Sequence, residues 1–124
     1  MTTLNLDDNQ AQYQIHAYRP GHIKINDESY TQSVIISPNQ LITDWQPQTI
    51  NELSKQSFDI ILTLKPSVLL IGTGNEHIFL APEIYGDLMN HGIGVEIMST
   101  GAACRTYNAL SSENRNVAAA LIIR

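Results

Sequence analysis

The sequence predicts an α/β fold of three layers with a mixed central sheet, and two observations lead to this prediction. Up to about Trp45, the chain consists of short extended pieces separated by turns. After that point, helical patterns alternate with short, continuously apolar segments. Strands that alternate with helices favour parallel pairing with right-handed crossovers. We therefore expect an N-terminal antiparallel meander followed by C-terminal βαβ-type units, in a single domain over residues 1–124.

The meander is expected from the extended pieces of the first part. Residues 23–26 alternate apolar and polar side chains, as a half-buried strand does. Residues 26–29 are a plausible hairpin turn that leads into a strand over residues 30–37. The other extended pieces are residues 13–18 and, after a turn at 37–40, residues 41–45.

The first helical pattern follows Trp45. Thr49 and Glu52 have the spacing of a capping box, in which each side chain bonds the backbone amide of the other residue. Apolar residues then fall near helical spacing, with an interruption around Ser57. Pro66 ends the segment, because a residue that precedes proline avoids the helical region.

Two further helices and three strands complete the pattern. Pro82 is well placed as the first residue of the second helix, and Gly92 provides a glycine stop. Thr100 can cap a third helix that runs to about residue 112. The strands are expected at residues 68–71, 93–98 and 117–123.

Composition excludes several classes of function. The 7 Lys and Arg residues against 12 Asp and Glu residues give a formal charge of −5, which disfavours nucleic-acid binding through a basic face. The single cysteine, Cys104, excludes an internal disulfide and an all-cysteine metal cluster. The four histidines lack metal-ligand spacing. We therefore expect neither a metal nor a cofactor.

The start of the chain has no targeting pattern. Residues 1–12 contain two aspartates, no Lys or Arg and no apolar run, unlike a secretory signal or a mitochondrial presequence. The strongest apolar stretches, residues 60–64 and 68–71, are far shorter than the roughly 20 residues that span a bilayer. We expect a cytoplasmic protein without membrane insertion, with residues 1–12 as a frayed terminus.

Two glycine turns form the candidate site. Open α/β sheets bind ligands beyond the carboxyl ends of their strands, and the turns Gly72–Asn75 and Ser99–Ala103 each follow an expected strand. If the strands are parallel, a cleft between Gly72–Asn75 and Thr100–Asn108 could hold a small anion or a carboxylate, with help from helix amides and Arg105. The candidate ligand-binding residues are Gly72, Thr73, Gly74, Asn75, Thr100, Gly101, Cys104, Arg105 and Asn108.

Other interpretations of these residues stay open. The turns match neither a phosphate-binding P-loop nor a dinucleotide fingerprint, so their glycines could be purely structural. Cys104, early in a helix beside Arg105, could have a lowered pKa and act as a nucleophile with His77 or His91 as its base. It could equally be a small buried residue of an alanine-rich helix face. We assign no catalytic residue, and whether the protein is an enzyme stays open.

The stretch Pro66–Ile123 resembles an uncharacterised domain family of bacteria, archaea and eukaryotes. The resemblance is carried by residues 69–74 (LLIGTG), 94–108 (GVEIMSTGAACRTYN) and 117–121 (VAAAL). Residues 21–45 also look like the family's first strands. Its eukaryotic members include a mitochondrial respiratory complex I assembly factor and an adipogenesis-associated Mth-type domain protein.

The resemblance implies a three-layer α/β fold and no established activity, cofactor or substrate. Its assembly-factor members imply association with partner proteins while a membrane complex forms. We therefore favour a non-catalytic binding or assembly module with a protein partner, and a homo-oligomer is compatible with it. The alternatives are a small-molecule or anion-binding protein or enzyme that uses the cleft between the glycine turns, and a redox sensor that uses Cys104.

Overall fold

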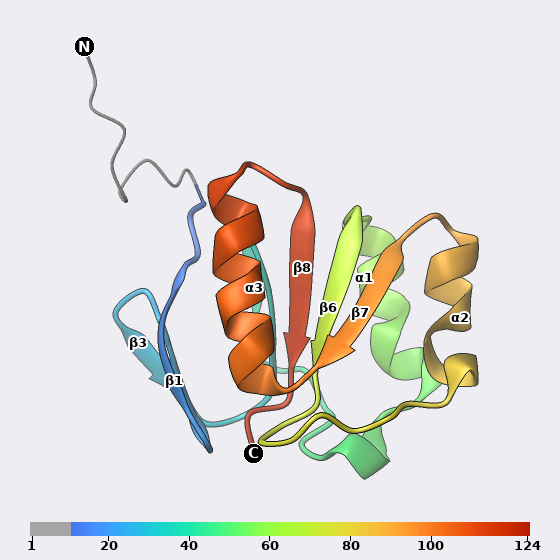
Figure 1. The fold of residues 1–124 in the computed structure, drawn as a ribbon, viewed down its shortest axis with the longest axis horizontal. Helices are drawn as coiled ribbons and strands as arrows, with labels where there is room; N and C mark the ends of the chain where they lie inside the picture. Colours follow the sequence, from blue (N-terminus) through green and yellow to red (C-terminus); the bar gives the residue numbers. More distant parts are fainter. Residues whose placement is uncertain (1–10) are drawn as a thin grey trace.

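A computed structural model describes residues 11–124. It contains a five-stranded sheet in the order β5-β4-β8-β6-β7 and a three-stranded sheet in the order β1-β2-β3. Helices cover both faces of the larger sheet, as Figure 1 shows. The strands are β1 (Ile15–Arg19), β2 (His22–Ile25), β3 (Glu28–Tyr30), β4 (Val34–Ser37), β5 (Gln40–Ile42), β6 (Val68–Gly72), β7 (Gly94–Met98) and β8 (Val117–Leu121). The helices are the 3-10 turns η2 (Ile50–Glu52) and η3 (Lys55–Phe58) and the α-helices α1 (Asp59–Leu64), α2 (Pro82–Asn90) and α3 (Thr100–Ser112).

The large sheet is mixed, as the sequence predicts. β6 pairs in parallel with both β7 and β8, whereas β4 is antiparallel to β5 and β8. Every residue of β6 and β8 is buried, which explains why both strands are continuous apolar or small-residue runs without alternation.

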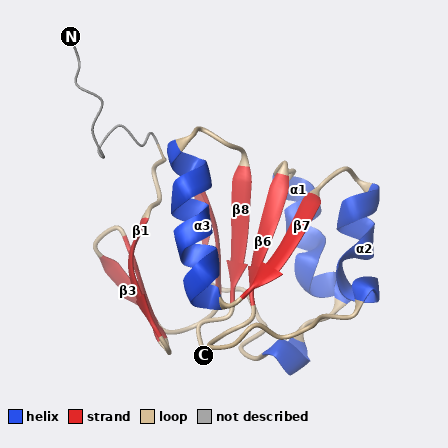
Figure 2. Ribbon diagram, in the orientation of Figure 1, coloured by secondary structure: helices blue, strands red, loops and turns tan. Residues whose placement is uncertain are grey.

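Two core layers lie on the two faces of the large sheet. On one face, Leu70 packs in a cluster with Tyr107 of α3 and Ile23 of β2. On the other face, Leu69 packs in a cluster with Phe58 and Leu88. Neighbouring residues of one strand thus enter opposite layers. This arrangement of helix, sheet and helix, visible in Figure 2, confirms the predicted three-layer α/β fold.

The N-terminal strands pair antiparallel, as predicted, but they divide between the two sheets. The expected strand over residues 30–37 is two strands in different sheets, because β3 ends at Tyr30 and β4 begins at Val34. Between them, the backbone amide of Ser33 donates to Gln48 Oε1 at 3.1 Å. The residue that would have continued the strand therefore bonds a loop side chain, and the chain crosses from the small sheet to the large one.

The first helix is broken more than expected, into η2, η3 and α1. The predicted capping box at Thr49 is absent: Thr49 makes no side-chain cap bond, and Glu52 Oε1 accepts from the backbone amide of Gln48 at 2.6 Å. The Ser54 backbone amide instead donates to Ser57 Oγ at 3.0 Å, and this bond marks the start of η3.

The other helix ends agree closely with the sequence pattern. α2 begins at Pro82, and Gly92 follows its end with φ +81°. α3 begins at Thr100 and ends at Ser112, but its N-cap is Ser99, whose Oγ accepts from Ala102 N at 3.4 Å. The expectation that Thr100 caps this helix is therefore wrong.

Most of the terminus expected to be frayed, residues 1–10, lies outside the described residues. At its end, Gln12 N donates to Pro38 O at 2.7 Å, so Gln12 is held against the β4–β5 turn. Within residues 11–124, no helix is long and apolar enough to cross a bilayer.

Candidate functional site

The two glycine turns lie side by side, as expected for turns that follow parallel neighbouring strands. Thr73 N donates to Met98 O at 2.9 Å, and Thr100 N donates to Gly74 O at 2.8 Å. Gly74 N in turn donates to Thr100 Oγ1 at 2.8 Å. Direct hydrogen bonds therefore join the two turns.

The glycines allow this close contact. A Cβ on Gly72 would lie 2.8 Å from Thr100 Oγ1 and 2.9 Å from Thr100 Cα. Gly74 has φ +103°, and a Cβ there would lie 2.5 Å from Arg124 O. The Thr100 hydroxyl also donates to Ile122 O. These contacts support the structural interpretation of the two glycines.

Two amides at the start of α3 already have partners within the protein. The amides of Thr100 and Ala102 are already bonded, to Gly74 O and Ser99 Oγ. Six of the nine candidate residues line two separate cavities, whereas Gly72, Gly74 and Thr100 line neither of them. Thr73 and Asn75 line one of about 260 Å³. The other, of about 210 Å³, is lined by Gly101, Cys104, Arg105 and Asn108.

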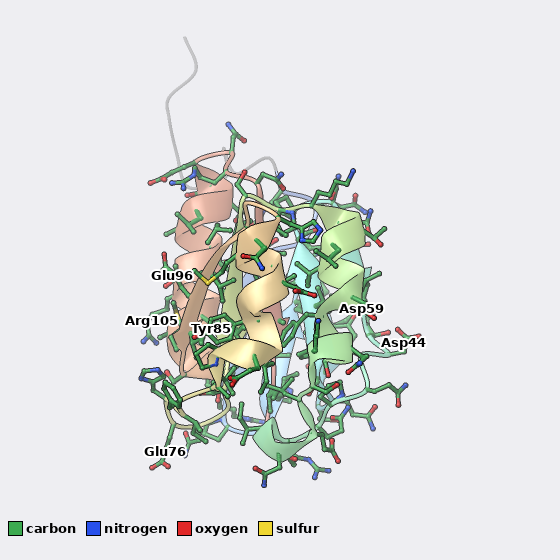
Figure 3. The ribbon with its side chains drawn as sticks, turned by 90° about the vertical axis from the view of Figure 1, so that its right-hand side faces the viewer. Asp44, Asp59, Glu76, Tyr85, Glu96 and Arg105 are labelled. Carbon is green, nitrogen blue, oxygen red and sulfur yellow. The ribbon has the colours of Figure 1, made fainter. Side chains whose placement is uncertain are left out.

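The second cavity lies between α3 and β1, and we call it the α3–β1 pocket. Residues 15–18 of β1 form its other wall. The four α3 residues lie on one face of the helix, because Cys104 and Arg105 are each three or four positions from both Gly101 and Asn108. Arg105 is exposed on the outer side of α3, as Figure 3 shows.

Cys104 lines this pocket but is a poor nucleophile. Its side chain is 3% exposed. Burial raises the pKa of the Cys104 thiol to about 12, and nearby Arg105 lowers the pKa only in part. The prediction of a lowered pKa is therefore wrong. Of the two candidate bases, His91 lies at the end of α2, on the other face of the sheet, and His77 is exposed in the loop before α2.

Asn108 has a structural role in the pocket wall. Its amide nitrogen donates to Ile15 O at 2.6 Å, and its amide oxygen accepts from Ile15 N at 3.1 Å. The hydroxyl of the preceding residue, Tyr107, donates to Tyr13 O at 2.7 Å. These bonds hold β1 against α3.

Sequence reasoning missed Tyr18 and His16, which line the pocket from β1. The Tyr18 ring lies against Gly101, where an added Cβ would be 3.3 Å from Tyr18 Cε2. The Tyr18 hydroxyl oxygen is buried and has no hydrogen-bond partner among the described residues. No spacing in the sequence connects β1 with α3, so only the fold could reveal this pairing.

A larger cavity of about 680 Å³ lies elsewhere, beside the broken first helix. Trp45 lines it and is itself buried, with its indole nitrogen donating to Ser57 O at 2.8 Å. Its charged lining residues are Asp44 and Glu52. In the part of the chain that the structure describes, no three His, Cys, Asp or Glu side chains gather to hold a metal.

Large apolar side chains are exposed along and before α2. Phe79 is 80% exposed, Met89 55% and Ile78 38%. Tyr85 lies four residues before Met89 and is half-buried. Figure 3 shows Tyr85 on the side of the molecule that α2 forms. We call these four residues the α2 surface.

The fold and its sites thus define a three-layer α/β protein in which six of the nine candidate residues line two separate cavities. Residues 15–122 match the family described as "Protein of unknown function (DUF498/DUF598)", and the chain belongs to this family. The predicted family resemblance is confirmed.

Three similar proteins illustrate the family. A protein of Francisella tularensis subsp. holarctica named "13 kDa major membrane protein" is 33% identical, over 98% of this chain and 100% of that protein. The zebrafish (Danio rerio) NADH dehydrogenase [ubiquinone] 1 alpha subcomplex assembly factor 3 is 34% identical over 87% of this chain, which spans only 63% of that relative. A crystal structure of a Bordetella parapertussis protein superimposes with a TM-score of 0.86 at 34% identity, covering 92% of this chain and 98% of that one.

Proposed function

We propose that this protein is a non-catalytic binding module that holds a partner protein during the assembly of a complex. Relatives named as assembly factors support this role for the shared region. The observation that carries the proposal is the α2 surface, and above all the 80% exposed side chain of Phe79. A large apolar side chain left in water favours a partner that covers it, since burying a Phe side chain contributes about 1.5–3 kcal/mol.

The α2 surface lies near an uncovered sheet edge. β7 is the last strand of the large sheet and pairs only with β6 in the described structure. An edge strand offers unpaired backbone groups to an added strand. A partner segment could therefore pair with β7 and place apolar side chains against the α2 surface.

The charges near this edge define the chemistry of the partner. Glu76, Glu83 and Glu96 lie in the preceding loop, in α2 and in β7, and none forms a salt bridge with a described residue. Figure 3 shows Glu76 and Glu96 on the same side of the molecule as Tyr85. We infer that the partner is a protein segment with apolar side chains interspersed with Lys or Arg, because complementary charge guides association and specificity.

The test compares captured proteins for three forms of the chain expressed in its own host. These are the wild type, the double variant Phe79→Ser/Met89→Ser, and the control Gln32→Ser, which changes an exposed residue between β3 and β4. We expect a reproducible partner that the wild type and the control retain. The purified partner should bind the double variant at least tenfold more weakly, as for a hot-spot residue. A partner retained equally by all three forms, or no reproducible partner, contradicts the proposal.

A cytoplasmic location and a homo-oligomeric state stay predictions. The Francisella relative is named a membrane protein, so the location of this chain needs its own measurement. Cell fractionation should recover this chain in the cytoplasmic fraction. Recovery in the membrane fraction after a high-salt wash would contradict that expectation.

A further inference from the structure

We propose that the α3–β1 pocket binds a small oxyanion, that is, the carboxylate or phosphate group of a small molecule. This site is separate from the α2 surface and does not depend on the proposed assembly role. Of the residues that the sequence suggested for an anion site, the proposed site keeps only those of α3. It adds Tyr18 and His16 of β1.

The charge of the pocket favours an anion. Arg105 forms no salt bridge within residues 11–124, although the whole chain has a formal charge of −5. The pocket lining contains Arg105 and His16 but no Asp or Glu. Glu96 lies on the same side of the molecule in Figure 3 but does not pair with Arg105. An oxyanion would give the guanidinium group the charged partner that the described residues do not supply.

The Tyr18 hydroxyl supplies the second argument. Its oxygen is buried without a hydrogen-bond partner. Burial, followed by the proximity of Cys104, raises the pKa of Tyr18, so the hydroxyl stays protonated and can donate. A buried hydroxyl without a hydrogen-bond partner is destabilising. A ligand oxygen that accepts from Tyr18 would remove this cost.

The size of the pocket limits the ligand. Its volume of about 210 Å³ lies below the roughly 300–1,000 Å³ of sites for drug-sized molecules. It can hold a phosphate or a short carboxylate with a few waters, each of which takes about 30 Å³ in the liquid.

The experiment titrates purified full-length protein with inorganic phosphate, acetate and succinate at constant ionic strength, with chloride as the reference anion. Binding is followed by the amide chemical shifts of residues 15–18 and 101–108. We compare the wild type with Arg105→Gln, Tyr18→Phe and the control Arg115→Gln. The control makes the same change of charge outside the pocket.

We expect saturable shifts with at least one of the three oxyanions and none with chloride. Affinity should fall at least tenfold in Arg105→Gln and about threefold in Tyr18→Phe, and it should change less than twofold in Arg115→Gln. A preference for phosphate or for the carboxylates identifies the ligand group. Tyr18→Phe removes an unpaired hydroxyl, so its melting temperature should not fall, and weaker binding then reports a lost contact.

Three results would overturn the inference. Chloride could reproduce the shifts, Arg105→Gln could bind as the wild type does, or Arg115→Gln could weaken binding as much as Arg105→Gln. The first two would show that the pocket does not recognise an oxyanion. The third would show binding by overall charge alone.

Discussion

The side-chain amide of Asn108 bonds both backbone groups of Ile15, donating to its carbonyl at 2.6 Å and accepting from its amide at 3.1 Å. The two residues are 93 positions apart in the sequence. β1 is the outer strand of the small sheet, so without Asn108 these groups of Ile15 would lack a strand partner on that side. A single helix side chain thus connects the small sheet to α3 and shapes one end of the α3–β1 pocket.

Replacing Asn108 with leucine should test this connection. The side chain keeps its approximate size but loses both bonds, and the two Ile15 groups remain partly buried. We expect the free energy of unfolding in urea to fall by about 2–3 kcal/mol. Hydrogen exchange at the Ile15 amide should also accelerate more than at Leu70. The exposed residue Asn90 provides a control, and a loss in Asn108→Leu no larger than in Asn90→Leu would refute the connection.

Two buried tyrosine hydroxyls predict opposite responses to phenylalanine. The Tyr107 hydroxyl donates to Tyr13 O, so Tyr107→Phe should lower the free energy of unfolding by about 1–2 kcal/mol. The Tyr18 hydroxyl has no partner, so Tyr18→Phe should leave stability unchanged or raise it by up to about 1 kcal/mol. Urea unfolding measures both, and equal losses in the two variants would contradict the assigned hydrogen bonds.

Alanine at Gly72 should disturb the contact between the glycine turns. The new Cβ would lie 2.9 Å from Thr100 Cα, and the backbone there cannot move aside easily. We expect a loss of about 1–3 kcal/mol, as for other overpacked sites. Gly86→Ala is the matched control: its Cβ meets nothing within 4 Å, and the change removes a glycine from inside α2. That variant should gain about 0.5–1 kcal/mol. In thermal and urea unfolding, Gly86→Ala should be more stable than the wild type and Gly72→Ala less stable. Any other order of stability would contradict the close contact of Gly72 with Thr100.

Cys104 predicts a loss of stability at alkaline pH. Its pKa is raised to about 12 in the folded protein, whereas an unfolded cysteine titrates near about 8.5. The contribution of the buried, protonated thiol to the free energy of unfolding is therefore complete below about pH 8.5. It declines as the pH rises toward 12, because the thiol of the unfolded chain loses its proton first. Between about pH 8.5 and 10, the free energy of unfolding of the wild type should fall by up to about 2 kcal/mol more than that of Cys104→Ala. Parallel stability curves for the two proteins would show that the buried thiol does not cause this loss.

Local signals in the sequence were sufficient for most of the large sheet. The buried runs at Val68–Gly72 and Val117–Leu121 are continuous in apolar or small residues, and Pro82 and Gly92 mark the ends of a helix by their backbone preferences. The division of the N-terminal strands between two sheets was not predictable. An alternating pattern such as residues 23–26 shows that one face is buried but does not identify the neighbouring strand.

The candidate site shows the same limit. Arg105 and Cys104 could be selected from their place early in a helix, but their neighbour Tyr18 lies in β1, far away in the sequence. Burial alone determines the pKa direction of Cys104, and burial depends on packing that no motif records. The close approach of the two glycine turns also depends on a tertiary contact, that of Gly72 with Thr100.

The position of β8 has a consequence for synthesis of the chain. Although it comes last of the eight strands, it lies between β4 and β6 at the centre of the large sheet. As the ribosome works from the N-terminus, β4–β5 and β6–β7 can each form as a pair, but neither can join the other before residues 117–121 emerge. Until then the two halves expose apolar strand edges. A nascent chain stalled before Val117 should therefore bind chaperones, and it should lose them once β8 is complete.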